Sequence, residues 1–275
     1  TYNTLNLQMK IILNKKKLLI ILNNEKKVGF VPTMGGIHKG HLSLINKSNE
    51  QNNITVVSIF VNKAQFNKKK DFDMYPRVFS KDIKILKKSN PHYLYYPNEK
   101  EIYPRVLQKK IKISSLNNKL CGKLRPGHFK AVIDVIERFV NIINPRTIYF
   151  GEKDLQQLLI LKEFLNKKFP KIKVVKCKTI REENGIPYSS RNFLLKKKQK
   201  KIASNVCKYL SENKKKILLN KIKIYKIKEN ILQLGVSKID YLEVLNYDNL
   251  KKYKGIKGKI FIAFYIDNVR LIDNL

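Results

Sequence analysis

The segment VPTMGGIHKGHLSL, residues 31–44, constrains the fold of this chain more than any other feature. A short apolar stretch is followed by a glycine pair and then by a sequence pattern typical of a helix, which begins near Gly40. On such a helix His38 and His41, three residues apart, lie on one face of the first turn. A helix N-terminus directs backbone N–H groups and positive partial charge at one spot, which suits a phosphate. A plain strand-to-helix turn with two surface histidines is the alternative that the segment alone leaves open.

Short β-rich runs alternate with helical text in the first two thirds of the chain. The runs are apolar and nearly continuous, as in parallel strands buried on both faces, and they span residues 28–31, 54–61, 93–96, 147–150 and 172–177. The clearest helix follows Phe129, where apolar residues recur every three or four positions until Pro145. Helical text is also expected from Leu5 onward. We predict an α/β fold with a doubly wound parallel sheet, whose ligands bind beyond the carboxyl ends of the strands.

The pattern changes after about residue 181. Lysine-rich helical text over residues 196–219 and a second helix to about residue 234 precede three short apolar runs. Those runs read as antiparallel strands over residues 239–244, 259–266 and 269–272. A chain of 275 residues exceeds the usual size of one domain. We therefore expect one domain over residues 1–180 and a smaller C-terminal α+β domain over residues 181–275.

The formal net charge of +37 raises the question of a polyanionic partner. Only eight of the 58 basic residues are arginines, and the lysines are scattered along the whole chain. Proteins that read nucleic acid usually concentrate their charge and use the bidentate arginine fork. We interpret the lysines as a solvated surface and expect no specific nucleic-acid partner. A nucleic-acid-binding protein remains the alternative of a different class.

The cysteines and the apolar runs bear on the compartment. Cys121, Cys177 and Cys207 are odd in number and far apart, which suggests neither a disulfide framework nor a metal knuckle. The apolar run at residues 18–22 is too short for a signal-peptide core or a membrane span. We expect a soluble, cytoplasmic protein without a membrane partner.

Further segments accompany the first one. They read SIFVNKAQF from Ser58, RPGHFKAVIDVIERFVN from Arg125, YFGEKDLQQ from Tyr149 and REENGIPYSSRN from Arg181. Together with the His-x-Gly-His segment they resemble the pantoate–β-alanine ligase (pantothenate synthetase) family, within the His-x-Gly-His nucleotidyltransferase superfamily, and the resemblance extends to the closing RLIDN. It implies a Rossmann-like domain, ATP as co-substrate with Mg²⁺, no tightly bound organic cofactor, and a homodimer.

The resemblance also implies a reaction in two steps. The carboxylate of pantoate attacks the α-phosphate of ATP to give pantoyl adenylate and pyrophosphate, and the amine of β-alanine then displaces AMP to give pantothenate. A carboxylate is already ionised near neutral pH, so the first step needs alignment and charge neutralisation and no base. The residues expected to act in catalysis are His38, His41, Lys153 and Arg191. The sequence does not identify a base for the amine step.

The resemblance assigns binding residues one by one. Contacts to ATP are expected from Met34, Gly35, His38, Gly40, His41, Gly151, Glu152, Lys153, Asp154, Ile180, Tyr188, Ser189, Ser190 and Arg191. Contacts to pantoate or β-alanine are expected from Gln65, Gln157 and Asn62. Taken without the resemblance, the serine pair reads as a helix cap, and Asn62 and Gln65 read as a polar loop after a strand.

The chain departs from the family pattern at several positions. Lys63 replaces a proline, and Ala131 replaces a glycine. Lys81 stands where the family has an acidic residue beside Asp82, so Asp82 is only a weak candidate for a Mg²⁺ ligand and better explained as an acid at a helix start. For His128, helix entry and a place in the pantoate pocket are equally good interpretations.

Two enzyme alternatives remain. Another adenylyl- or cytidylyltransferase would share the His-x-Gly-His segment, but Gln65, Gln157 and the RPGHF stretch favour pantoate recognition. The other is an enzyme that has lost its activity and is retained for a binding role, which the intact site residues disfavour. We further expect the second domain to act as a lid, because an acyl adenylate hydrolyses in water and needs shielding.

Overall fold

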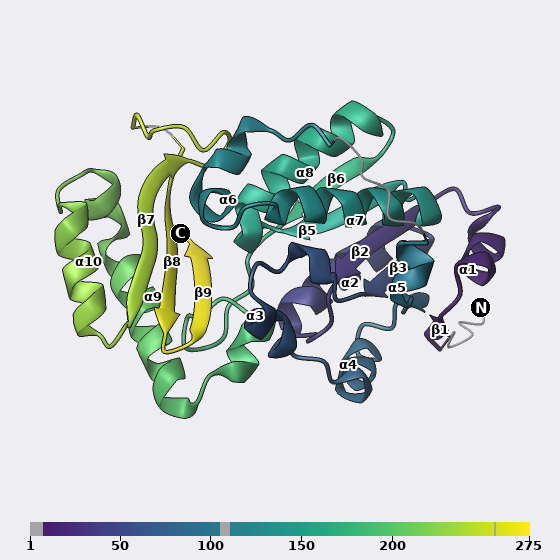
Figure 1. Ribbon diagram of the computed structural model, residues 1–275, viewed down its shortest axis with the longest axis horizontal. Coiled ribbons are helices and arrows are strands. Elements are labelled where there is room, and N and C mark those ends of the chain that lie inside the picture. The colour runs from purple at the N-terminus through teal and green to yellow at the C-terminus, as the bar shows by residue number, and fades with distance from the viewer. Residues whose placement is uncertain (1–7, 105–110, 256) are drawn as a thin grey trace, which may run out of the picture.

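The computed structural model describes residues 8–104, 111–255 and 257–275, and the chain forms two sheets with helices around them (Figure 1). The elements up to the second sheet are β1 (Lys10–Ile12), α1 (Lys15–Leu22), β2 (Val28–Thr33), α2 (Lys39–Gln51), β3 (Ile54–Ile59), α3 (Lys69–Asp73), α4 (Phe79–Leu86), β4 (Tyr93–Tyr95), α5 (Glu99–Ile102), α6 (Leu120–Leu124), α7 (His128–Ile143), β5 (Thr147–Gly151), α8 (Leu155–Lys168) and β6 (Lys173–Cys177). They are followed by α9 (Lys197–Leu218), α10 (Ile224–Gln233), β7 (Lys238–Asn246), β8 (Gly258–Ile266) and β9 (Val269–Asn274).

Strands β1 to β6 form one parallel sheet in the described part of the chain, in the order β1-β4-β3-β2-β5-β6. From β2 the chain first builds outward through β3 to β4 and then returns to add β5 and β6 on the other side. The predicted doubly wound α/β sheet is confirmed. The winding direction reverses between β2 and β5, and in such sheets the crevice beyond the strand ends at this point holds the ligand.

Alternate residues of the central strands bury opposite faces of this sheet. Phe30 packs on the α7 side, where its ring lies 5.5 Å from that of Phe139. Its neighbour Val31 belongs to a separate cluster with Ile45 of α2 and Leu86 of α4. Both faces are therefore covered by helices, which explains why these strands are apolar over most of their length.

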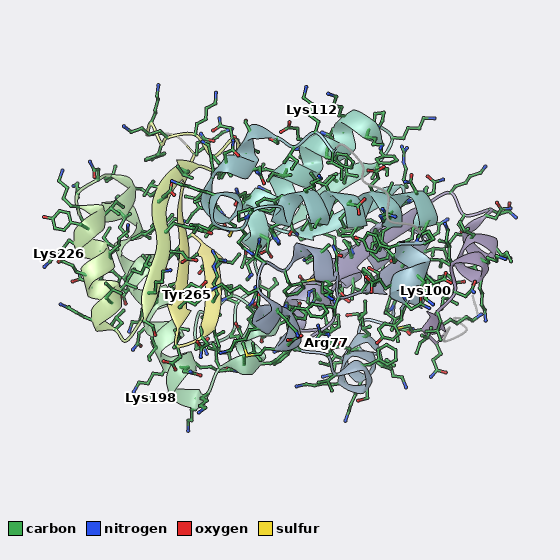
Figure 2. All side chains as sticks on the ribbon, viewed as in Figure 1. Arg77, Lys100, Lys112, Lys198, Lys226 and Tyr265 are labelled. Atoms are coloured by element: carbon green, nitrogen blue, oxygen red, sulfur yellow. The ribbon has the colours of Figure 1, made fainter. Side chains whose placement is uncertain are left out.

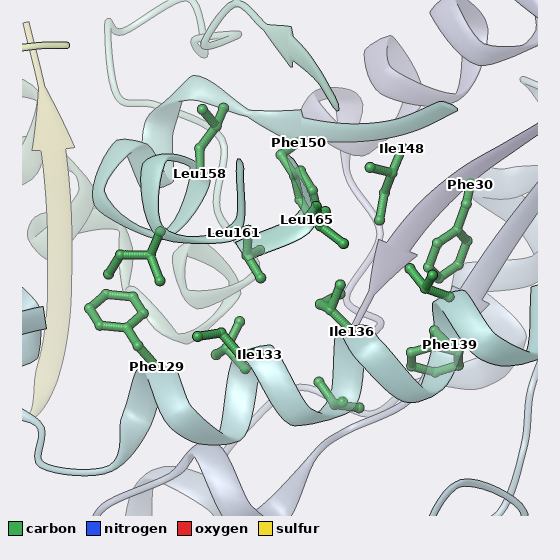
Figure 3. Packing of buried hydrophobic residues seen from close by; sticks show 14 of the residues in the cluster. Phe30, Phe129, Ile133, Ile136, Phe139, Ile148, Phe150, Leu158, Leu161 and Leu165 are labelled. Carbon is green, nitrogen blue, oxygen red and sulfur yellow. The ribbon is translucent and has the colours of Figure 1, made fainter. Parts of the chain in front are cut away.

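Helix α7 gives the sheet its largest apolar cover. Figure 3 shows Phe129, Ile133, Ile136 and Phe139 on the face of α7 that points to α8, β5 and β2. Gly127 precedes the helix with φ 77° and Asn144 ends it with φ 47°, both in the left-handed region, just before Pro145. The predicted helix is confirmed, and its start places the RPGHF stretch beside the end of β3.

The second sheet is antiparallel, in the order β7-β8-β9, as predicted. Helices α9 and α10 pack on it, and Figure 1 shows this layer at one end of the molecule, with β9 on the side of the larger sheet. Tyr241 and Phe261 of its opposite face join the core that contains α7 and α8. The expected domain boundary near residue 181 stays a prediction.

The start of the described chain differs from the expected helical text. Residues Lys10–Ile12 form β1 at the edge of the parallel sheet, with Lys10 opposite Tyr93 and Ile12 opposite Tyr95, and α1 begins at Lys15. The prediction from Leu5 onward is wrong for β1, because pairing with β4 and burial of Ile12 decide its conformation; residues 5–7 lie outside the described residues.

Lysine side chains are spread over the surface. Figure 2 shows Lys112, Lys198 and Lys226 at widely separated points on the outline of the molecule. All three cysteines are buried free thiols. Within the described ranges, none of the helices combines the length and apolar character that crossing a membrane requires.

Candidate active site

A cavity of about 260 Å³ lies at the carboxyl ends of β2, β3, β5 and β6. It brings together predicted site residues from four separate segments of the sequence. The predicted residues that line it are Met34, His38, Gly40, His41, Asn62, Gln65, Gly151, Lys153, Asp154, Gln157, Ile180, Tyr188, Ser189, Ser190 and Arg191. Gly35, Glu152 and Asp82 lie outside this lining.

The two imidazoles of the His-x-Gly-His segment stack at the start of α2. Their ring centroids are 3.9 Å apart, and a Cβ on Gly40 would come within 3.0 Å of the His38 ring. Burial, His41 and Lys153 lower the pKa of His38 to about 2. Burial also lowers the pKa of His41 to about 4, with Lys153 adding to this effect and Asp154 opposing it. Both rings are therefore neutral near pH 7 and can donate a hydrogen bond to a phosphate without carrying charge.

The turn between β2 and α2 is fixed from two sides. Gly35 and Gly36 have φ of 80° and 61°, and a Cβ on Gly36 would lie 2.7 Å from the side chain of Ser190. Asp82 accepts hydrogen bonds from the backbone N–H groups of Gly36, at 2.9 Å, and Ile37, at 2.8 Å. The Ser190 hydroxyl lies 3.2 Å and 3.0 Å from the carbonyl oxygens of Gly35 and Gly36, to which it donates. The glycine pair is needed here because the chain turns tightly against its neighbours.

Asp82 stands in the first turn of α4, as the helix-start interpretation expects. Its side chain is also buried against the β2–α2 turn, and both carboxylate oxygens are engaged there. Burial raises its pKa, while the N–H groups of Ile37 and Gly36 act in the opposite direction. These contacts favour a structural role over metal binding for Asp82.

The amide pair after β3 is held by the RPGHF stretch. His128 Nδ1 lies 2.8 Å from the carbonyl oxygen of Gln65 and donates to it, and Arg125 donates to the same oxygen at 3.1 Å. Asn62 donates to the Gln65 side-chain oxygen at 3.3 Å and to the carbonyl of Ala131 at 3.2 Å. Burial and Arg125 lower the pKa of His128 to about 4. The backbone of Gln65 is thus held by Arg125 and His128, and the side chain of Asn62 is held by the carbonyl of Ala131 in α7.

The turn after β5 divides its charged residues between two directions. The Lys153 side chain is 17 % exposed, lines the cavity, and has its ammonium 3.6 Å from the carboxylate of Asp154. Glu152 instead accepts a hydrogen bond from Lys259 at 3.0 Å and lies 3.6 Å from Lys176. Its carboxylate is therefore committed to the second sheet and to β6.

Arg191 enters the cavity from the segment that joins the two sheets. Ser189 accepts the N–H of Arg191 at 3.3 Å, which caps the short 3₁₀ helix Ser190–Leu194. The Arg191 guanidinium donates to both oxygens of Asp71, at 3.0 and 2.9 Å. The cation is thus held at the cavity wall by a carboxylate from α3.

Sequence reasoning left other lining residues out of the assigned site. These are, among others, Thr33, Tyr75, Arg125, His128, Lys178 and Thr179. Arg125 and His128 belong to the RPGHF stretch, so the resemblance already pointed to them. Tyr75, Lys178 and Thr179 carry no sequence signal, because the fold alone brings them to the strand ends.

A family model described as Pantoate-beta-alanine ligase matches residues 7–275. The chain belongs to the pantoate–β-alanine ligase family. The pantothenate synthetase of Caldicellulosiruptor saccharolyticus is 39 % identical over 274 residues, covering 98 % of this chain and 96 % of that protein. The pantothenate synthetase of Fervidobacterium nodosum is 39 % identical over 259 residues, covering 92 % of each. The resemblance found in the motifs is thereby confirmed over nearly the whole chain.

Solved structures of the family share the fold. The pantothenate synthetase of Thermus thermophilus superposes with a TM-score of 0.89 at 30 % identity, covering 97 % of this chain and 99 % of that one. The pantoate-beta-alanine ligase of Francisella tularensis, a complex with Beta-gamma ATP and Beta-alanine, has a TM-score of 0.85 at 36 % identity and covers 97 % of each chain. The match extends over both sheets.

Proposed function

We propose that this chain is an ATP-dependent ligase that condenses pantoate with β-alanine to give pantothenate, AMP and pyrophosphate. The observation that carries the proposal is one cavity that joins two kinds of groups. Its lining holds a first set of groups, His38, His41, Lys153 and Arg191, and a second set, the neutral amides of Gln65 and Gln157. The first set suits a triphosphate and the second suits a small hydroxy acid.

The first set of groups supports transfer of AMP to a carboxylate. Lys153 and Arg191 offset the negative charge of the phosphates, while the neutral imidazoles of His38 and His41 donate N–H groups. The Nδ1 atoms of both rings are buried, and none of the described residues serves as a hydrogen-bond partner for them. Because the pKa of His41 is lowered to about 4, its neutral ring can hydrogen-bond the phosphate, and the negative charge of a bound phosphate acts on this pKa in the opposite direction.

The second set of groups supports recognition of pantoate. Gln65 and Gln157 offer donors and acceptors for a hydroxyl and a carboxylate without adding charge. Asn62 holds the side chain of Gln65 by a hydrogen bond, and its own side-chain oxygen accepts a hydrogen bond from the Tyr103 hydroxyl at 3.1 Å. We propose that Gln65 and Gln157 hold pantoate so that its carboxylate oxygen can attack the α-phosphate of ATP. Pantoyl adenylate is then the intermediate.

Magnesium fits this site as a companion of ATP. Among the described residues, no cluster of three or more histidine, cysteine or acidic side chains is suited to hold a metal ion. Asp154 lines the cavity with a side chain that is 48 % exposed, and it is the carboxylate we expect to contact the ion. Mg²⁺ commonly takes one or two carboxylates with phosphates and water, and it would supply further neutralisation of phosphate charge.

The segment that links the two sheets bears on how the intermediate is shielded. The segment that carries Tyr188, Ser189 and Arg191 lies between the parallel sheet and α9 and forms part of the cavity wall. We propose that residues 181–275 close over ATP and pantoate as a lid. Small-angle scattering should detect compaction when both are added, and an unchanged radius of gyration contradicts closure.

The assembly and the cellular location follow from the family in this proposal. We propose a homodimer located in the cytoplasm. Sedimentation velocity at micromolar concentration tests the dimer, and a monomer at every concentration contradicts it. Fractionation of cells that produce the chain tests the location.

A coupled assay of AMP release tests the function directly. Purified protein is given ATP, Mg²⁺, pantoate and β-alanine, and each component is then omitted in turn. We expect AMP release only with all components, and pantoate-dependent exchange of pyrophosphate into ATP without β-alanine. Failure to form an acyl adenylate from D-pantoate with ample Mg²⁺ refutes the proposal, and activity with a different acid would point to another adenylyltransferase.

A further inference from the structure

The RLIDN stretch that closes the chain has no part in the site described so far. It belongs to β9, the edge strand of the second sheet on the side of the parallel sheet. We propose that Asn274 is a positioning residue that sets the place of Lys153 at the ATP phosphates. This inference rests on the proposed function and adds a residue from the second sheet to the adenylation machinery.

The carboxamide of Asn274 holds the turn after β5 by its backbone. Its Nδ2 donates to the carbonyl oxygen of Glu152 at 2.9 Å and to that of Lys153 at 2.8 Å. Asn274 is 3 % exposed, so water does not replace these bonds easily. One amide group therefore satisfies two successive carbonyls of the turn that presents the lysine.

The oxygen of the same carboxamide completes a bridge. Asn274 Oδ1 accepts a hydrogen bond from Lys259 Nζ at 2.9 Å, and this ammonium also donates to the carboxylate of Glu152 at 3.0 Å. The turn is thus held through its backbone by Asn274 and through the Glu152 side chain by Lys259. Both holding residues lie on the second sheet, on β9 and β8.

Asn274 is itself firmly placed. It stands opposite Phe261 in the β8–β9 pairing, and its N–H donates to Asp273 at 2.7 Å. The carboxylate of Asp273 receives two hydrogen bonds from Arg181, at 2.8 and 2.9 Å. The carboxamide therefore has a fixed origin from which to hold the turn.

The turn needs this external support because it has little of its own. Between β5 and α8 it consists of the 3₁₀ segment Glu152–Asp154, for which no side-chain cap exists among the described residues. Lys153 must place its ammonium on charge that develops at the phosphates, and displacements of about 1 Å at such groups can cost about a hundredfold in rate. Loss of the two Asn274 bonds would free the Lys153 backbone while leaving its side chain intact.

The test uses Asn274→Asp, which keeps the shape and the oxygen that faces Lys259. The second carboxylate oxygen then opposes the two carbonyls where the amide donated. We expect kcat of pantoate-dependent pyrophosphate exchange to fall at least about tenfold, with KM for pantoate within twofold of wild type. Asn230→Asp is the matched control, because it removes an amide of α10 that donates to the hydroxyl of Tyr209 on α9, and it should keep wild-type exchange.

Coupling to Lys153 separates positioning from a general structural effect. In the double variant Asn274→Asp/Lys153→Ala, we expect exchange within threefold of Lys153→Ala alone, because Asn274 acts through the lysine that is already lost. Effects that multiply overturn the inference, as does Asn274→Asp with wild-type kcat. If Asn274→Asp does not fold, Asn274→Ala carries the same expectations without an added charge. Wild-type protein without exchange refutes the proposed function and this inference together, whereas an active wild type with an unaffected variant refutes only the inference.

Discussion

Replacement of Asp82 by asparagine separates a structural role from metal binding. The carboxylate receives the N–H groups of Gly36 and Ile37 at 2.9 and 2.8 Å in a site where the residue is 4 % exposed. Asparagine keeps one acceptor oxygen and turns an NH₂ group toward the other N–H. One charge-assisted bond is lost and a buried donor is left without an acceptor, at a cost of about 1–3 kcal/mol in the free energy of unfolding.

Urea unfolding and a magnesium titration measure the two roles of Asp82 side by side. In thermal unfolding, the expected loss in the free energy of unfolding would lower Tm by about 2–4 °C per kcal/mol for a protein near this size. The Mg²⁺ concentration that gives half-maximal pyrophosphate exchange should stay within twofold of wild type. Asp154→Asn is the matched comparison, since we expect it to raise the Mg²⁺ requirement with little change in stability. Unchanged stability of Asp82→Asn with a tenfold higher Mg²⁺ requirement would refute the structural reading.

Three further outcomes are expected. His41→Ala should lower the adenylation rate at least about a hundredfold with folding intact, and near-normal pyrophosphate exchange would count against it. Acid should destabilise the protein. The pKa values of His38, His41 and His128 are lowered to about 2, 4 and 4. Below pH 6.5 the unfolded chain therefore binds protons that the folded chain does not, and stability falls as the pH falls. Urea unfolding at pH 7 and pH 5 should show a lower free energy of unfolding at pH 5, by up to about 1.4 kcal/mol per pH unit for each histidine. Phe139→Ala, in the centre of the α7 interface, should cost about 3–5 kcal/mol by urea unfolding, and a cost below about 1 kcal/mol contradicts the packing.

The sequence predicted the fold where a pattern was long and repeated. Helix α7 has an apolar residue at nearly every third or fourth position, and the central strands are mostly apolar, so both were recognisable alone. Strand β1 has only three residues, and its pairing with β4 decides its conformation. Short edge strands take their structure from a neighbour that the local sequence does not reveal.

The convergence of the motifs at one cavity was predictable for a topological reason. Parallel strands end at one edge of a sheet, so motifs that follow such strands converge there, as His41, Gln65 and Lys153 do. Contacts between distant segments were not predictable. Asp71 reaches Arg191 across 120 positions in the sequence, and Asn274 reaches the backbone of Lys153 across 121. No local sequence pattern marks such a pair, because aspartate, arginine, asparagine and lysine are all common on protein surfaces.

The hydrogen bonds from Asn274 to the turn that carries Lys153 bear on the order in which the parts of the protein fold. Contacts that span so much of a polymer close slowly, since chain entropy opposes bringing distant ends together. Helices such as α7 form from near neighbours and need no such search. A refolding chain should consequently regain its far-ultraviolet signal before it regains affinity for nucleotide, and competence to bind ATP becomes a late acquisition of the maturing protein.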